Sequence, residues 1–388
     1  MLLSIILLSC MFHTITASTP QVNAIEFNNF GFAGSYTPVI ELANIYDEQQ
    51  CSCSISNTPT LFNGTNAPLN EEVSVHFRGP LQLINFASYV SDGYTFGEDN
   101  SGNFSRLSFY DAGEGIGENV TFLTRAGKNS SCLGFGLTFA DSDGISAANE
   151  PTILADNTLL NSNQEFVIFS NVSCESSGVD NDCGVYREDI PAYHGFFGTT
   201  KMFLFKFTMP NETKSAWDVA NYNMPAIWLL NAQIPRTAQY SNDVNCSCWR
   251  SGCGEFDIFE VMNVTEYTHL YSTLHDYQGT GDIESGLASN GHTERDLQGD
   301  MVGGVVFDST GKVVVWMSNS TSFDEVVAAK DLNSWIHDVA QGKELAATTL
   351  PTVSAPTETS SHTTKKNNGY VLQQSPLIVL LSALLWFI

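Results

Sequence analysis

The sequence predicts an all-β protein, a β-sandwich preceded by a smaller β-rich module. In residues 201–210, Phe203, Phe205, Phe207 and Met209 occupy alternate positions, so the segment would form a strand with one fully apolar face. Many other short segments alternate between turn signals, whereas only residues 332–339 show a modest helical pattern before the Ser/Thr-rich C-terminal stretch. Many short strands with few helices are typical of a sandwich.

Composition narrows the classes of partner. The chain has 388 residues, of which 43% are hydrophobic, which suffices for a sizeable core. A formal charge of -26 with only 16 Lys and Arg residues excludes nucleic acid and anionic membrane surfaces as good partners. A neutral polysaccharide meets no such repulsion. No cofactor and no metal are expected, and a monomer is expected.

Both ends of the sequence carry processing signals. Residues 1–18 combine an apolar run with small residues, as in a secretory signal peptide. Residues 346–367 form a Ser/Thr-rich linker, and residues 368–388 have the spacer and apolar tail of a GPI-attachment propeptide. We expect attachment at Asn367, with Asn368 as the alternative. The apolar stretch 377–388 is too short to span a bilayer, which needs about 20 residues.

Cysteines and glycosylation sequons agree with export. Cys10 leaves with the signal peptide, and an even number in an exported chain predicts disulfides among Cys51, Cys53, Cys132, Cys174, Cys183, Cys246, Cys248 and Cys253. A zinc cluster at the last three is the alternative, but no matching His or Cys pair accompanies them. Sequons for N-glycosylation occur at Asn63, Asn103, Asn119, Asn129, Asn171, Asn211, Asn245, Asn263 and Asn319.

A polar, glycine-rich stretch divides the mature chain. Residues 97–106 predict a linker between a β-rich N-terminal module, residues 19–97, and a sandwich domain, residues 98–345. The module shows no constellation of acids or nucleophiles and could pack on the next domain or bind glycan. His76 and Arg78 are either ligands or solvated strand residues, and we favour the second interpretation.

Three acids lie close together in the stretch from Gly254 to Glu260. In a strand, Glu255 and Asp257 share one face, and a one-residue bulge would bring Glu260 to the same face. A pair of carboxyls can cleave a glycosidic bond, one as nucleophile and one as acid, and a third charge raises the pKa of the acid. The alternative is an acidic edge strand in an acidic protein.

The flanking blocks resemble glycoside hydrolase family 16, the laminarinase-like β-glucanases. Their order and rough spacing match over residues 190–280, in Gly195-Phe196-Phe197-Gly198, Phe203–Pro210, Pro225-Ala226-Ile227-Trp228-Leu229-Leu230, Gly254–Glu260 and Thr273-Leu274-His275. The whole chain is also similar to the fungal "target of SBF" cell-wall proteins, through Phe77-Arg78-Gly79-Pro80 and the Cys246–Gly254 run. These resemblances imply a β-jelly-roll fold and, in some members, a GPI anchor.

The family 16 resemblance also implies roles. Glu255 would be the nucleophile, Glu260 the general acid/base, and Asp257 the residue that tunes and orients them. Trp228 would stack on sugar in the substrate cleft or lie in the core, and His275 would hydrogen-bond the nucleophile or sugar or be a buried structural residue. Trp249 and Tyr277 are further substrate-binding candidates, and the Cys-rich insert before Gly254 would narrow or cap the cleft.

Two functions follow from these features. The first is a cell-wall glycoside hydrolase or transglycosylase that acts on β-1,3-glucan with retention of configuration. The second is a non-catalytic wall glycoprotein that binds glucan, which the anchor and the Ser/Thr-rich stalk would also suit. Either protein would be secreted and held at the outer face of the plasma membrane by its GPI lipid, or linked to wall glucan. A calcium-dependent adhesin lacks an oxygen-ligand loop motif.

Overall fold

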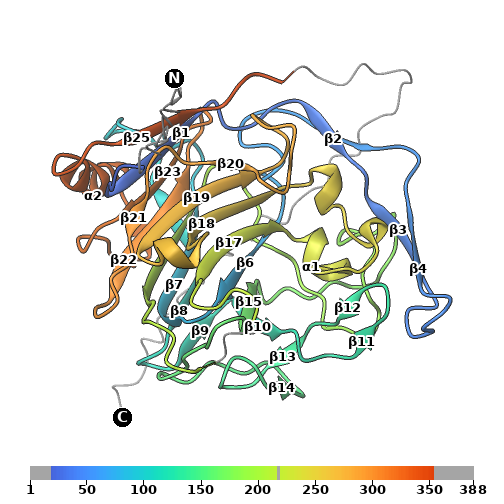
Figure 1. The fold of residues 1–388 in the computed structure, drawn as a ribbon. Helices are drawn as coiled ribbons and strands as arrows, with labels where there is room; N and C mark the ends of the chain where they lie inside the picture. Colours follow the sequence, from blue (N-terminus) through green and yellow to red (C-terminus); the bar gives the residue numbers. More distant parts are fainter. Residues whose placement is uncertain (1–18, 216–218, 354–388) are drawn as a thin grey trace, which may run out of the picture. The chain divides into compact units, whose positions relative to one another are not determined.

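The structure is a computed structural model that describes residues 19–215 and 219–353. The predicted signal peptide, the GPI propeptide and Asn367 lie outside these residues. Most strands of the described chain belong to two large sheets (Figure 1). The nine-stranded sheet contains, in spatial order, β24 (Val326–Val327), β8 (Phe104–Asp111), β7 (Gln82–Val90), β16 (Lys201–Thr208), β22 (Met301–Phe307), β23 (Val313–Met317), β1 (Ala24–Asn28) and β25 (Ala346–Thr349), with β9 (Ile116–Glu118) beside β8.

The second sheet has ten strands. In spatial order it contains β14 (Ala147–Ala148), β13 (Thr138–Ala140), β10 (Thr121–Thr124), β15 (Glu165–Phe169), β6 (Val73–Arg78), β17 (Ala226–Asn231), β18 (Glu255–Glu260), β19 (His269–His275) and β20 (Leu287–Ala288), with β21 (Thr293–Glu294) beside β19. The named strand pairs are antiparallel apart from β1 and β25, which run parallel. Three two-stranded ribbons join β2 (Gly34–Tyr36) to β5 (Thr60–Phe62), β3 (Val39–Ala43) to β4 (Ser52–Ile55), and β11 (Asn129–Ser130) to β12 (Gly134–Phe135).

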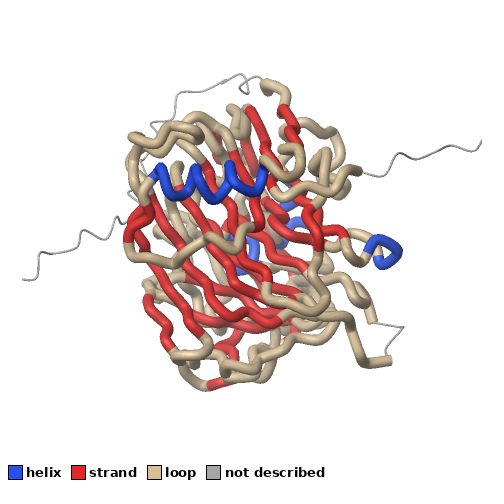
Figure 2. The backbone as a smooth tube through the Cα atoms, turned by 90° about the vertical axis from the view of Figure 1, so that its left-hand side faces the viewer, coloured by secondary structure: helices blue, strands red, loops and turns tan. Residues whose placement is uncertain are grey.

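Helices are few and short. They are α1 (Gln233–Thr237), α2 (Ala329–Ala340) and the 3₁₀ turns η1 (Val244–Cys246), η2 (Trp249–Ser251) and η3 (Val264–Glu266). The helix predicted over 332–339 is therefore present and longer by a few residues. It lies across the strands of the nine-stranded sheet (Figure 2), where Leu332, Trp335 and Ile336 pack with Trp316. Within the described chain, no helix is both long and apolar enough to cross a membrane.

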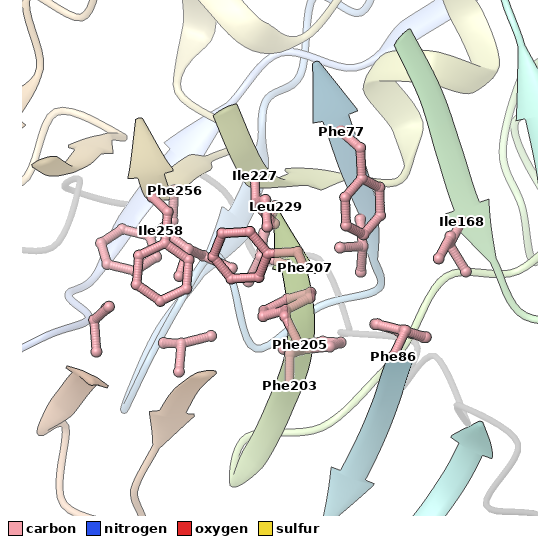
Figure 3. Packing of buried hydrophobic residues seen from close by; sticks show 14 of the residues in the cluster. Phe77, Phe86, Ile168, Phe203, Phe205, Phe207, Ile227, Leu229, Phe256 and Ile258 are labelled. Carbon is pink, nitrogen blue, oxygen red and sulfur yellow. The ribbon is translucent and has the colours of Figure 1, made fainter. Parts of the chain in front are cut away.

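One apolar core joins the two large sheets. The predicted core strand is β16, and its Phe203, Phe205 and Phe207 are fully buried. They belong to the same cluster as Phe77 from β6 and Phe256 from β18, which come from the other sheet (Figure 3). Burial of aromatic side chains at this scale is the main stabilising term of such a fold. The all-β, two-sheet expectation is thus confirmed.

Strands of residues 19–97 share both large sheets with later strands. β1 lies between β23 and β25, β7 lies between β8 and β16, and β6 lies between β15 and β17. The region expected as a separate N-terminal module is therefore interwoven with the expected sandwich domain. The start of the predicted Ser/Thr-rich linker, residues 346–367, is a strand in the structure, since Ala346–Thr349 forms β25. Its alternation explains this, because Ala346 and Thr348 are buried while Ala347 and Thr349 are exposed.

The eight cysteines of the described chain form four disulfides, so the zinc alternative does not hold. Cys51–Cys132 and Cys53–Cys246 fasten the β3–β4 ribbon to distant parts of the chain. Cys174–Cys183 closes a local loop, and Cys248–Cys253 closes a shorter one just before β18. The last disulfide lies beside the three acids.

Candidate active site

The predicted bulge is present in β18. Against β19, Asp257 pairs with Thr273 and Glu260 pairs with Tyr271, so three steps along β18 match two along β19. The extra residue makes Ile258 and Phe259 both face the shared core, where each is fully buried. Side chains on either side of a bulge are re-aimed in this way. Glu255, Asp257 and Glu260 consequently lie on the opposite face of the ten-stranded sheet.

Glu255 is held by the loop that precedes its strand. The indole Nε1–H of Trp249 donates a hydrogen bond to Oε2 of Glu255. Trp249 begins η2 inside the loop that the Cys248–Cys253 disulfide closes, and the two cysteines are five positions apart in the sequence. Gly252 ends this turn at φ 93°, in the left-handed region that favours glycine. The Cys-rich insert therefore delivers an N–H donor to one carboxylate.

Asp257 forms a buried ion pair with His275. The Nε2 atom of His275 lies 3.1 Å from Oδ2 of Asp257, and both side chains are at least nine-tenths buried. In the sheet register, His275 stands directly opposite Glu255. Burial alone would lower the pKa of His275, but the hydrogen bond with Asp257 and the charges of Asp257 and Glu255 raise it to about 10. The imidazolium thus places a positive charge among the three acids.

Glu260 forms its own ion pair, with Arg78 of β6. The Nη2 atom of Arg78 lies 3.0 Å from Oε1 of Glu260, although β17 runs between their strands. Ala226 of β17 is the cross-strand partner of both residues. Its methyl group is small enough for the arginine side chain to pass over it.

The environment favours a retained proton on the two glutamic acids. Burial, followed by the charge of Asp257, raises the pKa of Glu255 and of Glu260 above the usual range for Glu. His275 and the Trp249 hydrogen bond oppose this for Glu255, and Arg78 opposes it for Glu260. Two carboxyls whose pKa values are raised by burial and a neighbouring charge are suited to general acid–base chemistry.

Two other predicted substrate-binding residues, Trp228 and Tyr277, differ in their exposure. Trp228 lies on the same side of the sheet as the acids, opposite Asp257, but only 3% of it is exposed and it stacks on His76 at 5.1 Å between centroids. Tyr277 is 39% exposed, and its hydroxyl donates to the Arg250 carbonyl in the Cys248–Cys253 loop. His275 belongs to the site, because its ring contacts Asp257. Its hydrogen-bond partner among the acids is thus Asp257 and not Glu255.

The interpretation of His76 and Arg78 as solvated strand residues is wrong. Only 1% of His76 and 8% of Arg78 are exposed, because β6 lies in the middle of the ten-stranded sheet. His76 is close to the Ser74 hydroxyl, at 2.8 Å from its Nε2, and burial lowers its pKa well below the usual range. Arg78 belongs to the site through Glu260.

Glu165 and Tyr240 extend the site and were not singled out in the sequence. Glu165 of β15 stands directly opposite Arg78, and its carboxylate accepts hydrogen bonds from the Tyr240 hydroxyl at 3.0 and 3.1 Å. Arg125 lies 3.3 Å from the same carboxylate. One sequence feature could have identified Glu165: it is a charged residue at the start of the apolar strand Glu165–Phe169. A charge that is buried with such a strand needs a partner.

The architecture and the acids define a class, a two-sheet β protein with three carboxyls on one bulged strand. Two models of one protein family match the chain. The family model described as cell wall protein YJL171C/Tos1, C-terminal, matches residues 102–335, and the corresponding N-terminal model matches residues 23–91. The chain therefore belongs to the YJL171C/Tos1 cell wall protein family.

Curated relatives extend over nearly the whole chain. A Candida albicans protein named "Probable circularly permuted 1,3-beta-glucanase PGA52" is 62% identical over 385 residues, 99% of both chains. In Saccharomyces cerevisiae, "Probable circularly permuted 1,3-beta-glucanase YJL171C" is 48% identical, covering 96% of this chain and 94% of its own. The S. cerevisiae protein of the same description named TOS1 is 30% identical over 81% of this chain and 90% of its own. No solved structure matches the chain.

Proposed function

We propose that this protein is a cell-wall glycoside hydrolase or transglycosylase that cleaves β-1,3-glucan by a retaining double-displacement mechanism. The observation that carries the proposal is the bulge in β18, which brings Glu255, Asp257 and Glu260 to one face while Phe256, Ile258 and Phe259 stay in the core. The names of the curated relatives, which describe probable 1,3-β-glucanases, support cleavage of this substrate. An acidic edge strand would need no bulge of this kind, and β18 is not at an edge.

In the first step, Glu255 acts as the nucleophile. Its carboxylate oxygen forms a bond to the anomeric carbon while the glycosidic C–O bond breaks, and Glu260 transfers its proton to the departing oxygen. The products are a glycosyl ester on Glu255, a shortened glucan with a free hydroxyl, and an ionised Glu260. The Trp249 N–H donor keeps the Glu255 carboxylate oriented before the attack.

In the second step, Glu260 acts as a base. It takes a proton from water, or from a hydroxyl group of another sugar, as that oxygen attacks the anomeric carbon and breaks the ester to Glu255. Two inversions at the same carbon give net retention, which requires the two carboxyls to act from about 5–5.5 Å apart. Water yields hydrolysis, and a sugar acceptor yields transfer.

The charged residues around the pair set its protonation. Asp257 disfavours a second negative charge on either glutamate, while His275 compensates Asp257 at 3.1 Å. Arg78 limits the pKa rise at Glu260 and is positioned to stabilise the charge that this residue acquires when its proton leaves. Burial and Asp257 therefore favour the protonated form of each glutamate, and the neighbouring cations favour its ionised form.

The proposed location is the cell wall and the outer face of the plasma membrane. Membership of a cell wall protein family supports it. Removal of residues 1–18 and GPI attachment at Asn367 are part of this proposal, as is linkage to wall glucan.

Product analysis tests the proposal directly. Purified wild type would be incubated with laminari-oligosaccharides, beside Glu255→Gln, Glu260→Gln and, as a matched control, Glu114→Gln, whose side chain is exposed in the turn after β8. We expect shortened or lengthened chains from wild type and the control, a loss of about 10³-fold or more in the two site variants, and products of retained configuration by proton NMR. Wild type without any turnover, or site variants as active as wild type, would leave a non-catalytic glucan-binding wall glycoprotein as the function.

A further inference from the structure

A row of polar side chains begins at Glu260 and runs across the ten-stranded sheet. Arg78 meets Glu260 at 3.0 Å, Glu165 stands opposite Arg78, and the Tyr240 hydroxyl binds Glu165. The row passes from β18 over β17 and β6 to β15, at right angles to the strands. Three strand spacings amount to roughly 14 Å. A polymer lying along this row would contact the acids at one end and Tyr240 at the other.

Tyr240 presents an aromatic surface that is both fixed and exposed. Its hydroxyl is 3.0 and 3.1 Å from the two carboxylate oxygens of Glu165, and the Arg125 guanidinium lies 4.0 Å from its ring centroid. Nevertheless 44% of the residue is exposed. An aromatic side chain held in one orientation loses little conformational entropy on binding and offers an apolar face to the C–H face of a sugar.

A small hollow beside Tyr240 supplies the polar part of such a site. It is lined by Tyr240, Gln239, Arg125 and Phe135, among others, and has room for about one water-sized group. Both the amide oxygen and the amide nitrogen of Gln239 are buried, and neither has a hydrogen-bond partner within the described residues. A hydroxyl group can donate to the first and accept from the second. Sugar hydroxyls have this chemistry.

We propose that Tyr240 and Gln239 form a distal subsite for one glucosyl residue of a β-glucan chain whose reacting bond lies at Glu255 and Glu260. The ring of the sugar stacks on Tyr240, and one of its hydroxyls enters the hollow to meet the Gln239 amide. Because the subsite is several sugars from the acids, only longer chains reach both. This inference rests on the proposed function for its direction along the sheet, but its binding test does not require turnover.

Phe135, which also lines the hollow, lies beside the glycosylation sequon at Asn129. Phe135 is 56% exposed and stands opposite Asn129 in the β11–β12 ribbon, so a glycan on Asn129 would cover this side of the hollow. Binding is therefore measured on the full secreted chain after enzymatic removal of N-glycans. Phe135 is not needed for the stacking described above.

The test uses calorimetric binding of laminarihexaose and laminaribiose to Glu255→Gln protein, in which the ligand is not consumed. Adding Tyr240→Ala should weaken hexaose binding about tenfold, the scale of one aromatic contact, and leave biose binding unchanged. Gln239→Ala should weaken hexaose binding severalfold in the same way. Tyr240→Phe keeps the ring, loses only the bond to Glu165, and should retain most of the affinity. Phe197→Ala is the matched control, since Phe197 is also 44% exposed and lies outside this row.

The outcomes separate the subsite from the proposed reaction. Equal hexaose affinity with Tyr and with Ala at position 240, in proteins with the same melting temperature, would overturn the subsite even if the wild type is an active glucanase. Equal losses for biose and hexaose would also overturn it, because they would place Tyr240 near the reacting bond. A selective loss for hexaose in a protein whose wild type shows no turnover would support the subsite and refute the enzyme.

Discussion

The Nη2 atom of Arg78 lies 3.0 Å from Oε1 of Glu260 although strand β17 runs between their strands. Ala226 of β17 is the cross-strand partner of both residues. Glu165 stands on the other side of Arg78, so the guanidinium lies between two carboxyl groups from β15 and β18. This arrangement decides how firmly Glu260 holds the proton that the proposed mechanism requires.

Replacing Arg78 with Gln should move the alkaline limb of the pH–rate profile to higher pH. Burial and the charge of Asp257 raise the pKa of Glu260, and Arg78 opposes them. Without the cation the pKa rises further, so the acid form survives to higher pH. The variant should also be less stable than wild type, because the carboxyl groups of Glu260 and Glu165 lose the guanidinium between them.

The measurement is kcat/KM for a laminari-oligosaccharide between pH 4 and 10, together with the melting temperature. Arg78→Lys keeps a positive charge and should leave the limb closer to that of wild type. An alkaline limb that stays in place or moves to lower pH would mean that Glu260 is not the group whose proton is titrated.

Replacing Trp249 with Phe should reduce kcat while keeping the fold. The change removes the indole N–H that donates to Glu255 but keeps an aromatic ring in the loop. A hydrogen bond to a charged group is worth about 1.5–3 kcal/mol, which corresponds to a loss of roughly ten- to a hundredfold. Because this bond opposes the rise of the Glu255 pKa, the acidic limb should move to higher pH.

The matched control for this variant is Trp335→Phe. Trp335 lies on α2 and packs against the nine-stranded sheet, far from the acids in the fold. It should alter stability without moving the pH profile. If both variants change kcat equally, the contact between Trp249 and Glu255 has no special role in orienting the nucleophile.

The Cys248–Cys253 disulfide should matter for activity, whereas Cys174–Cys183 should matter mainly for stability. Their sequence separations are 5 and 9, so removal of either should cost a similar amount, about 2–3 kcal/mol. Only the first closes the loop that carries Trp249. Changing both of its cysteines to Ser should therefore lower kcat in the manner of Trp249→Phe. The same kcat in the two double variants, compared well below their melting temperatures, would contradict this.

Asn119 should be the sequon that carries no glycan. Its side chain is engaged at both ends, donating to the Leu107 carbonyl at 3.1 Å and accepting from the Asn171 backbone N–H at 3.0 Å. Asn119 is half-buried, whereas the other eight sequon asparagines are exposed. Glycopeptide mass spectrometry of the secreted protein checks this prediction. A fully occupied Asn119 would show that the sugar is added before this turn forms.

The parts of the fold that depend on residues close together in the sequence could be predicted from the sequence. Alternation identified β16, and the offset of Glu260 from Asp257 predicted the bulge, because both follow from the two-residue period of a strand. Helix α2 followed from its apolar spacing. The two long-range disulfides, Cys51–Cys132 and Cys53–Cys246, and the sharing of both sheets by β1, β6 and β7 could not be predicted, since they depend on which distant strands meet.

The same limit applies to the candidate site. The three acids lie within six consecutive residues, and the resemblance to known glycosidases assigned them roles. Arg78 looked like a solvated strand residue because nothing in its own segment reveals that β6 is central and that Glu260 faces it across β17. Trp228 reads equally well as a core or a substrate-binding residue, and its burial depends on the covering ribbon β2–β5, which supplies Tyr36 and Phe62.

Stability should fall as the pH rises from neutral to alkaline, and His275 should account for part of the slope. The pKa of His275 is raised to about 10 in the folded protein, as the Asp257 hydrogen bond outweighs burial, and it is about 6.5 in an unfolded chain. Between these values the folded state binds a proton that the unfolded state has released. The contribution is therefore complete below pH 6.5 and is lost as the pH rises through 10.

The expected slope from this residue is up to about 1.4 kcal/mol of unfolding free energy per pH unit. Urea unfolding at pH 6, 7, 8 and 9 measures it in wild type and in His275→Gln, whose amide can still donate to Asp257 but does not titrate. Subtracting the two curves cancels the ionisable groups that do not interact with His275, whereas Glu255 and Asp276 also shift in the variant, because the charge of His275 lowers their pKa. Parallel curves would show that the Asp257–His275 contact holds a neutral imidazole, and the positive charge assigned to the site would then have to come from Arg78 alone.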